Sequence, residues 1–361
     1  MKVSFRYLLV FLAISLSSMD VNAQTPITIG QSYTLKSDLL HESREIQIYL
    51  PKTYTDSTLT PQYYPVVYLL DSESNFNYFT AYIEKLAKYP YPAIPEMIVV
   101  GIVNTNRTRD LTPTRRNENV MTPAQKAKIK GESGGNALFF QFIAEELKPF
   151  IRQQFRVNDY AILVGHSFGG ITALHNLLHY TAMFQAYIVH DPSIWWDETF
   201  ILKEYQANAQ QDFKHRKLFL TQVGDSENKG HLEDHYSAIQ AFNTFMQERP
   251  LTGLTYQYQQ YEGENHGSIP MKGNLDGLRY IFEDYPLNFK AIEQDPDLVR
   301  TTFARLSESL HFDFQPNEAY LRYIISYYDK QKNSALVAYF IAYCLTLYPE
   351  STIRQEIADN R

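Results

Sequence analysis

The chain has almost no cysteine. Cys344 is the only one among its 361 residues, so no disulfide can form within the chain. It lies in an apolar helical pattern, which indicates a buried structural thiol rather than a nucleophile. The length is sufficient for one large domain with its own core, plus an appendage.

Long hydrophobic runs are also lacking. The apolar run at residues 7–16 is too short to span a bilayer. It follows Lys2 and Arg6 and precedes a small-residue segment that ends at Ala23, which is the pattern of a cleaved signal peptide. We therefore assign residues 1–23 to a signal peptide and expect an exported protein, periplasmic or secreted, with no membrane span.

Clusters of positive charge are scarce as well. The formal net charge is −7, and no basic cluster is larger than the pair Arg115-Arg116. An acidic chain of this kind argues against nucleic acid as the main partner. The expected partner is a small molecule.

Strand-like and helix-like segments alternate from about residue 44 to residue 285. This alternation predicts an α/β fold with a mostly parallel sheet and helices on both faces. Two early strand-like segments, 44–50 and 64–70, have no helix between them, which predicts an antiparallel edge. Beyond Pro286 the pattern is helical only, so we expect a main domain at 24–286 and a helical extension at 287–361.

The extension carries one clear apolar stripe, formed by Leu321, Ile324, Ile325 and Tyr328. With a second apolar helix at 333–348, it weakly resembles a single tetratricopeptide unit. One such unit cannot bury its own apolar face. It should therefore pack on the main domain or on another protein, as a homodimer or through docking by these helices.

The most informative motif is Gly-His-Ser-Phe-Gly-Gly at residues 165–170. A short β-branched run precedes it and a helical pattern follows it, so it fits the strand–turn–helix context of a nucleophile elbow. The flanking glycines leave room for the tight turn. This places the hydroxyl of Ser167 at the start of a helix, where developing negative charge is favoured.

A serine nucleophile needs a base, an orienting acid and an oxyanion hole. His266 is the predicted base, because it lies in a glycine-containing loop between the last strand and the last helix of the main domain. Glu227 is the favoured acid, Asp225 is the alternative, and Asp191 is a further possibility.

The predicted oxyanion hole consists of backbone amides. One is that of Phe168, directly after the nucleophile. The other is that of Ser72 or Glu73, in the segment that follows the strand at 64–70. The sequence does not separate these two, since a backbone donor leaves no side-chain trace.

Several segments together resemble one family of esterases. They are Tyr-Pro-Val-Val-Tyr-Leu-Leu-Asp at 64–71, Ile-Pro-Glu-Met-Ile-Val-Val-Gly-Ile at 94–102, Arg-Thr-Arg-Asp-Leu-Thr-Pro at 107–113, the serine motif at 165–170 and Asp-Pro-Ser-Ile-Trp-Trp at 191–196. The family includes esterase D, feruloyl and acetylxylan esterases, and siderophore trilactone esterases, and the periplasmic trilactone branch is the most similar. The resemblance implies an α/β-hydrolase fold and serine ester hydrolysis without a metal or other cofactor. One departure is Asp71-Ser72, where relatives often have a glycine after the first position.

Substrate contacts are expected from two loops. Arg107 and Arg109 could meet an anionic substrate, although pairing of Arg109 with Asp110 in a solvated loop is an alternative. Trp195 and Trp196 follow a strand end and could stack on an aromatic acyl group or pack in the core. His166, beside the nucleophile, is also a candidate for substrate binding.

Other functions stay open at this point. A carbohydrate esterase that releases feruloyl or acetyl groups is one alternative, and a non-catalytic binding protein on a hydrolase scaffold is another. Two histidine pairs, His175 with His179 and His231 with His235, have spacings that metal sites use. The first pair has no evident third ligand, and the second lacks the glutamate that a zinc helix has next to its first histidine, so no metal is expected.

Overall fold

The computed structural model describes residues 25–115, 131–224 and 233–359, together with residues 123 and 126. The predicted signal peptide therefore lies outside the described residues. The central element of the fold is an eight-stranded sheet in the order β1-β2-β4-β3-β5-β6-β7-β8. The strands are β1 (Gln31–Ser37), β2 (Glu42–Tyr49), β3 (Tyr64–Leu69), β4 (Ile98–Ile102), β5 (Val157–His166), β6 (Ala186–His190), β7 (Arg216–Val223) and β8 (Leu254–Tyr261).

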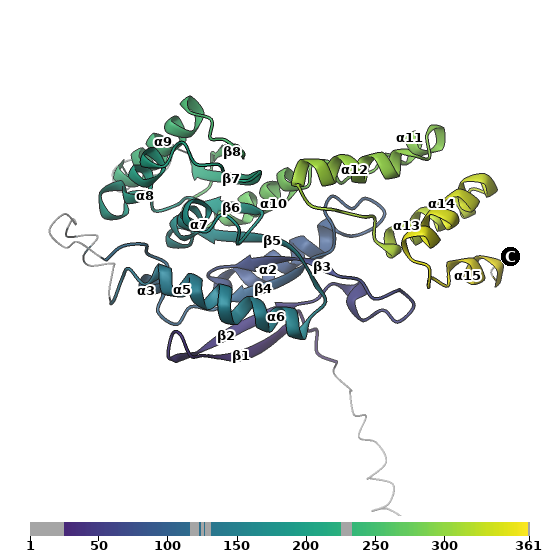
Figure 1. Ribbon diagram of the computed structural model, residues 1–361, viewed down its shortest axis with the longest axis horizontal. Helices are drawn as coiled ribbons and strands as arrows, with labels where there is room; N and C mark the ends of the chain where they lie inside the picture. The colour runs from purple at the N-terminus through teal and green to yellow at the C-terminus, as the bar shows by residue number, and fades with distance from the viewer. Residues whose placement is uncertain (1–24, 116–122, 124–125, 127–130, 225–232, 360–361) are drawn as a thin grey trace, which may run out of the picture.

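Helices connect most of these strands and continue beyond them (Figure 1). They are η1 (Lys52–Thr55), α2 (Ser72–Leu86), α3 (Arg107–Asp110), α5 (Asn136–Phe142), η2 (Ile143–Leu147), α6 (Lys148–Gln154), α7 (Phe168–His179), α8 (Trp196–Ala207), α9 (Glu233–Glu248), α10 (Ile269–Ile281), α11 (Phe289–Gln294), α12 (Leu298–Leu310), α13 (Glu318–Lys330), α14 (Ser334–Leu347) and α15 (Ile353–Asp359). Within the described part of the chain, no helix is both long enough and apolar enough to cross a membrane.

The sheet confirms the predicted fold class. Strands β3 to β8 run parallel to one another, while β1 and β2 form an antiparallel edge. Every residue of β3, β4 and β6 is buried, as expected for strands covered on both faces. β8 alternates between half-buried and exposed positions, which suits its place at the other edge.

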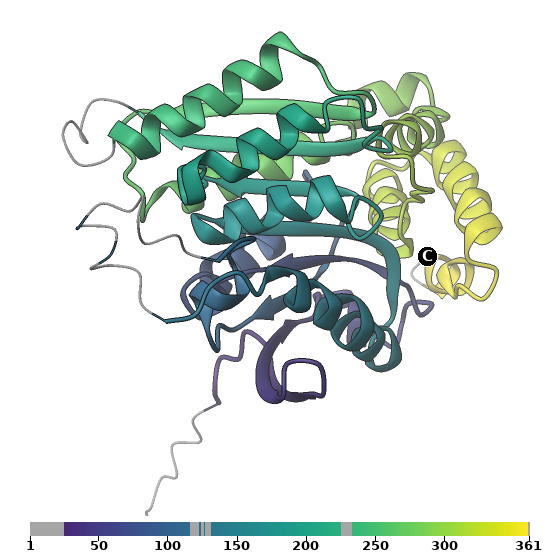
Figure 2. The same ribbon diagram turned by 60° about the vertical axis from the view of Figure 1, so that its left-hand side comes forward.

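Helices cover both faces of the sheet (Figures 1 and 2), and a hydrophobic layer lies on each face. Val66 and Tyr68 of β3 point into the layer formed with α5, α6, α7, α8 and α9. Their neighbours Val67 and Leu69 point into the opposite layer, formed with α2, α10 and the C-terminal helices. This alternation along one strand assigns each helix to a face.

Some details of the sequence prediction are wrong. The segments 44–50 and 64–70 do not pair with each other, because β4 lies between β2 and β3. The antiparallel edge instead pairs β2 with β1, a strand that the pattern did not reveal because only Ser37 of its residues is buried. Helix α8 was not predicted either, and residues 197–199 at its start have left-handed backbone angles.

The C-terminal helices pack on the main domain, one of the two arrangements expected for them. Tyr320 of α13 is fully buried, and its ring lies 5.2 Å from that of Tyr89 and 5.9 Å from that of Tyr285. The hydroxyl of Tyr89 donates a hydrogen bond of 2.9 Å to Asn317, the N-cap residue of α13. Residues beyond 286 therefore share a hydrophobic core with α2 and α10. Their docking to another protein stays a prediction.

A buried histidine joins the sheet to α10. His190, at the end of β6, shares hydrogen bonds of 2.9 Å with Thr221 and 2.8 Å with Asn274. Gly273 allows this approach, since a Cβ atom there would lie 2.5 Å from the His190 ring. Burial lowers the pKa of His190 to about 4, so the ring is neutral at pH 7.

We predict that this burial makes stability depend on pH. Below an unfolded-state pKa of about 6.5, the unfolded chain binds a proton at residue 190 that the folded protein does not bind until about pH 4. The free energy of unfolding should therefore decrease as the pH is lowered from about 6.5 to about 4. At pH 5 this one residue should have removed about 2 kcal/mol relative to neutral pH. Urea unfolding of the wild type and of His190→Gln at several pH values measures it. The variant should show the shallower pH dependence, and equal slopes would contradict the assignment.

Candidate active site

Ser167 occupies a sharp turn between β5 and α7. Its backbone angles are φ 58° and ψ −114°, a strained combination for a residue with a side chain. Gly165 makes the turn possible, because a Cβ atom there would collide with the backbone carbonyl of Gly169. Gly170 similarly admits Pro192, whose Cβ would be 2.9 Å from an added Cβ. The structure thus forms the strand–turn–helix that the motif predicted.

The turn is held to the end of the neighbouring strand. The Ser167 amide donates to the His190 carbonyl at 3.0 Å, and the Ser193 amide donates to the Ser167 carbonyl at 3.1 Å. The two hydroxyl groups of Ser167 and Ser193 also lie 3.1 Å apart. Ser193 is almost fully buried, so it gives the Ser167 hydroxyl a fixed hydrogen-bonding partner.

His266 reaches this turn from the loop between β8 and α10. Its ring centre lies 4.4 Å from that of His166, the residue before Ser167. Its Nδ1 is 2.5 Å from Oδ2 of Asp191. The side chain of His266 is 39% exposed, whereas that of Asp191 is fully buried. With Nδ1 engaged by the carboxylate, Nε2 is the nitrogen left for other chemistry.

Asp191 follows β6 directly and is the carboxylate that contacts His266. Its amide donates to the Thr221 carbonyl at 2.8 Å, and its Oδ1 accepts a hydrogen bond from the Val223 amide at 3.3 Å. Burial acts to raise the pKa of Asp191, but hydrogen bonds from His235 and His266 outweigh it and hold that pKa below its ordinary value. The carboxyl group is therefore ionised at neutral pH.

The favoured acid, Glu227, and its alternative, Asp225, lie outside the described residues. Asp191 was only a further possibility in the sequence, yet among the described residues it is the carboxylate that contacts Nδ1 of His266. Its signal was available in outline, because it immediately follows a buried strand. What the sequence could not reveal is that this strand is the neighbour of β5.

His235 is a residue of the site whose place the sequence did not reveal. It comes from the first turn of α9, and its Nε2 lies 3.1 Å from Oδ2 of Asp191. Two imidazole rings therefore approach the same carboxylate oxygen, with ring centres 5.2 Å apart. The sequence had offered His235 only as half of a pair with His231, which lies outside the described residues.

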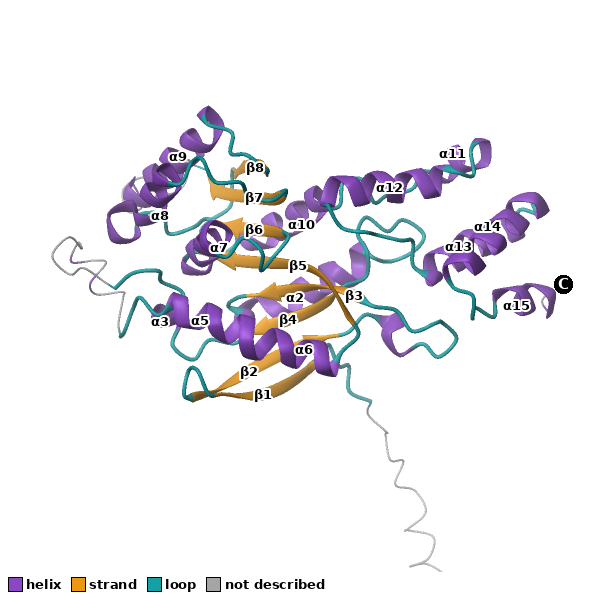
Figure 3. Ribbon diagram, in the orientation of Figure 1, coloured by secondary structure: helices purple, strands orange, loops and turns teal. Residues whose placement is uncertain are grey.

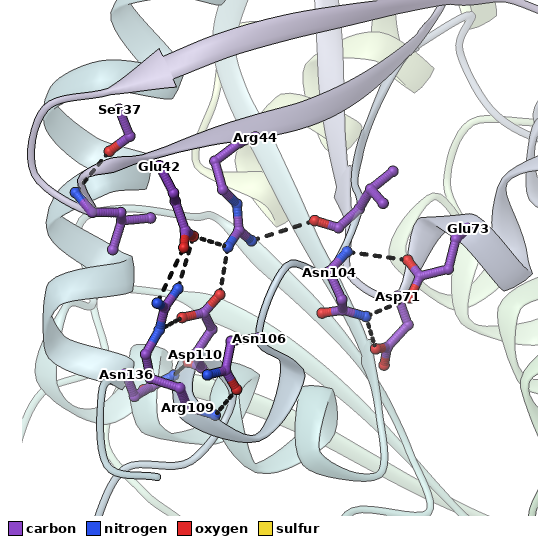
Figure 4. A network of polar contacts seen from close by, with 12 residues as sticks. Ser37, Glu42, Arg44, Asp71, Glu73, Asn104, Asn106, Arg109, Asp110 and Asn136 are labelled. Carbon is purple, nitrogen blue, oxygen red and sulfur yellow. Dashed lines mark hydrogen bonds and ion pairs between the residues drawn. The ribbon is translucent and has the colours of Figure 1, made fainter. Parts of the chain in front are cut away.

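The candidate oxyanion donors lie at the N-termini of two neighbouring helices. Phe168 is the first residue of α7, and Ser72 and Glu73 are the first two of α2. These helices follow β5 and β3, which are adjacent in the sheet. Amides in the first turn of a helix have no partner within it, so both segments can supply donors. Glu73 uses its side chain to bind Asn104 at 2.7 Å (Figure 4).

Arg107 and Arg109, both predicted to contact substrate, pair with carboxylates of the protein. Arg107 binds Asp71 with two contacts of 2.6 Å and 2.9 Å, and its guanidinium lies 5.4 Å from the centre of the Phe168 ring. Its side chain is 36% exposed and already paired with Asp71. Because it lies against Phe168, it borders the site as one half of an ion pair.

Arg109 belongs instead to a charge network that anchors the loop after β4 (Figure 4). It lies 2.7 Å from Glu42 and 2.7 Å from Asp110. Asp110 is buried and also pairs with the fully buried Arg44 at 2.5 Å. The structure therefore has the local pairing with Asp110 that the sequence offered as an alternative, although Asp110 is buried rather than solvated. A contact of Arg109 with substrate stays a prediction.

The two tryptophans differ in their surroundings. Trp196 is 2% exposed, donates to Thr114 at 3.0 Å and packs edge-on against Phe168 at 5.2 Å. Trp195 is half-buried, with its ring 6.2 Å from that of Phe168. Core packing therefore accounts for Trp196, and Trp195 is the ring that a ligand could reach.

The remaining histidines of the candidate list have different surroundings. Burial lowers the pKa of His166 to about 2, with further lowering by His266 and His190, so this ring is neutral. His175 pairs with Asn136 at 2.7 Å, and His179 lies 3.2 Å from Glu204. Among the described residues, neither ring belongs to a group of three possible metal ligands.

Comparisons with known proteins point to one family of enzymes. A family model described as "Putative esterase" matches residues 37–268. The chain is 29% identical to ferri-bacillibactin esterase BesA of Bacillus subtilis over 243 residues, which cover 63% of this chain and 82% of the relative. It is 27% identical to a siderophore triacetylfusarinine C esterase of Aspergillus fumigatus over 292 residues, covering 74% and 98%.

A solved structure supports the same placement. An IroE-like serine hydrolase from Shewanella oneidensis superposes with a TM-score of 0.78 at 33% identity, covering 88% of this chain and 99% of that one. The two folds therefore match over most of this chain. The chain accordingly belongs to the Putative esterase family, in the branch with the siderophore esterases, and is a carboxylic-ester hydrolase.

Proposed function

We propose that the protein hydrolyses carboxylic esters through an acyl-enzyme on Ser167, with His266 as the base and Asp191 as the orienting acid. The observation that carries this proposal is the 2.5 Å contact between His266 Nδ1 and Asp191 Oδ2, made beside the strained turn that presents Ser167. A carboxylate on Nδ1 fixes the neutral tautomer that leaves Nε2 free to accept a proton.

The reaction then follows from these positions. His266 Nε2 takes the proton from the Ser167 hydroxyl as the oxygen attacks the ester carbonyl. The amide of Phe168, with that of Ser72 or Glu73, stabilises the oxyanion at the two helix N-termini. His266 passes the proton to the leaving alcohol, and a water molecule activated by the same ring hydrolyses the acyl-enzyme. Asp191 stabilises the imidazolium that forms in both steps.

The proposed substrates are polyesters of the siderophore type. Two relatives are named for siderophore hydrolysis, and the half-buried ring of Trp195 lies 6.2 Å from that of Phe168, the residue after Ser167. That ring can stack on an aromatic acyl group. Export of the protein, which the N-terminal sequence predicts, would let it meet such a substrate outside the cytoplasm.

A substrate panel separates this proposal from its rival. Iron-loaded and iron-free catecholate trilactones would be compared with feruloyl and acetyl sugar esters by liquid chromatography of the products. We expect the highest kcat/KM on a trilactone. A higher kcat/KM on a sugar ester would instead make the protein a carbohydrate esterase, with the same residues in the same roles.

Replacement of the nucleophile tests the mechanism. We predict that Ser167→Ala lowers kcat for a p-nitrophenyl ester by about 10⁴-fold or more, with an unchanged circular dichroism spectrum. Labelling by a fluorophosphonate probe should also disappear, because the probe reacts only with an activated serine. Ser193→Ala is the matched control and should keep its labelling, although its hydroxyl is 3.1 Å away. Labelling that survives in Ser167→Ala would refute the proposal and also favour a different nucleophile.

A second set of variants identifies the acid. We predict that Asp191→Asn lowers kcat by roughly 10³- to 10⁴-fold, because an amide stabilises neither the required tautomer nor the imidazolium. Glu227→Gln and Asp225→Asn should each lower kcat by less than about tenfold. Steady-state kinetics on all three, with thermal unfolding to check folding, measures this. A collapse of activity in Glu227→Gln together with a mild effect at Asp191 would transfer the role to Glu227.

Stacking by Trp195 can be tested separately. We predict that Trp195→Ala lowers kcat/KM for an aromatic acyl ester by about tenfold, the equivalent of about 1.4 kcal/mol of stacking. An acetyl ester of the same alcohol should be affected much less. Equal losses for the two esters would indicate that the ring supports the fold of the site rather than the acyl group.

A further inference from the structure

Three side chains bring metal-binding atoms together at the site. Oδ2 of Asp191 lies 2.5 Å from Nδ1 of His266 and 3.1 Å from Nε2 of His235. All three atoms lie within 4.8 Å of one another. They come from the end of β6, the loop after β8 and the first turn of α9. The tertiary fold therefore brings them together, and no sequence motif predicts the cluster.

The donor set is one that zinc uses. Two imidazole nitrogens and one carboxylate oxygen, with a water molecule in the fourth position, form a common tetrahedral zinc site. The carboxylate supplies negative charge within a buried pocket, since the side-chain exposure of Asp191 is 0% and that of His235 is 7%. His266, at 39% exposure, leaves the cluster open to solvent on one side, so an ion can enter there and keep its water.

The spacing needs only a small adjustment. Zinc binds nitrogen and oxygen ligands at about 2.0–2.2 Å, which places neighbouring ligand atoms of a tetrahedron about 3.3 Å apart. The present separations of 2.5 Å and 3.1 Å lie below this value, and the third is no longer than 4.8 Å. Small rotations of the two imidazole rings would open the two hydrogen bonds enough for an ion to lie between the three ligand atoms.

The other described histidines lack this convergence. Among the residues that the structure places, this is the one group in which three such side chains meet at metal-binding distance. His190 is held between Thr221 and Asn274, and His215 stacks on His311 at 3.7 Å with no third ligand grouped with them.

We propose that Asp191, His235 and His266 form a binding site for a zinc-class divalent cation, and that the bound ion switches the esterase off. The inhibitory part rests on the proposed function, whereas the binding part does not. A neutral imidazole has one free lone pair. When the ion takes the pair on Nδ1 of His266, the ring proton moves to Nε2, and that nitrogen can no longer accept the proton of Ser167. No proton is lost from either ring, and no other reactant is needed.

Binding is tested without using activity. The probe is Zn²⁺ alone, titrated by calorimetry into the metal-free wild type and into Ser167→Ala, with Co²⁺ as a visible-absorption reporter of tetrahedral coordination. We expect one equivalent to bind to both proteins. His235→Gln should weaken binding at least tenfold, whereas His311→Gln, which removes a histidine outside the cluster, should leave it unchanged. Absence of binding, or equal affinity in His235→Gln, would overturn the site.

Inhibition is tested on the active enzyme. Zn²⁺ should abolish hydrolysis of a p-nitrophenyl ester by the wild type, and a chelator should restore it. In His235→Gln, with rates expressed relative to that variant's own metal-free rate, at least tenfold more Zn²⁺ should be required for half-inhibition. Binding in the calorimeter without loss of turnover would overturn the switch, and it is distinguishable from failure of the esterase mechanism, which the metal-free kinetics of Ser167→Ala reports.

Discussion

The site depends on an unusual backbone conformation at the ends of three adjacent parallel strands. Asp71 after β3, Ser167 after β5 and Asp191 after β6 have φ values of 53°, 58° and 41°. Residues with side chains avoid this region, at a cost of roughly 1–3 kcal/mol each. The chain therefore turns sharply after each of these strands, and the three turns lie at the same end of the sheet, where the parallel strands terminate (Figure 3).

Backbone hydrogen bonds hold two of these turns to the neighbouring strands, and an ion pair holds the third. Ser167 donates to the carbonyl of His190 at the end of the next strand, and Asp191 donates to Thr221 on the strand beyond it. Asp71 is fixed by the ion pair with Arg107. The strain is thus offset by contacts that exist only when the strands are in register. This coupling explains how a hydroxyl and a carboxylate 24 residues apart in the chain are held in one site without a disulfide.

The sequence predicted what is local and missed what is tertiary. The elbow at Ser167 was predictable because glycines, strand and helix are contiguous, and His266 because one loop had the right composition and position. The carboxylate partner of that histidine was not predictable, because the sequence offered Glu227, Asp225 and Asp191. Only the neighbouring positions of β5 and β6 in the sheet favour Asp191. Arg109 shows the same limit, since its partner Glu42 is 67 residues away.

The helices beyond residue 286 lie at the opposite end of the sheet from the turns (Figures 1 and 3). Phe314 packs against Tyr160, near the start of β5, with ring centres 5.0 Å apart. The buried carboxylate of Glu318 accepts a hydrogen bond of 2.6 Å from the amide of Thr60, just before β3. These contacts tie the extension to the amino ends of the same strands whose carboxyl ends carry Asp71 and Ser167. The extension therefore packs on these strands at the end of the sheet away from the turns of Asp71 and Ser167.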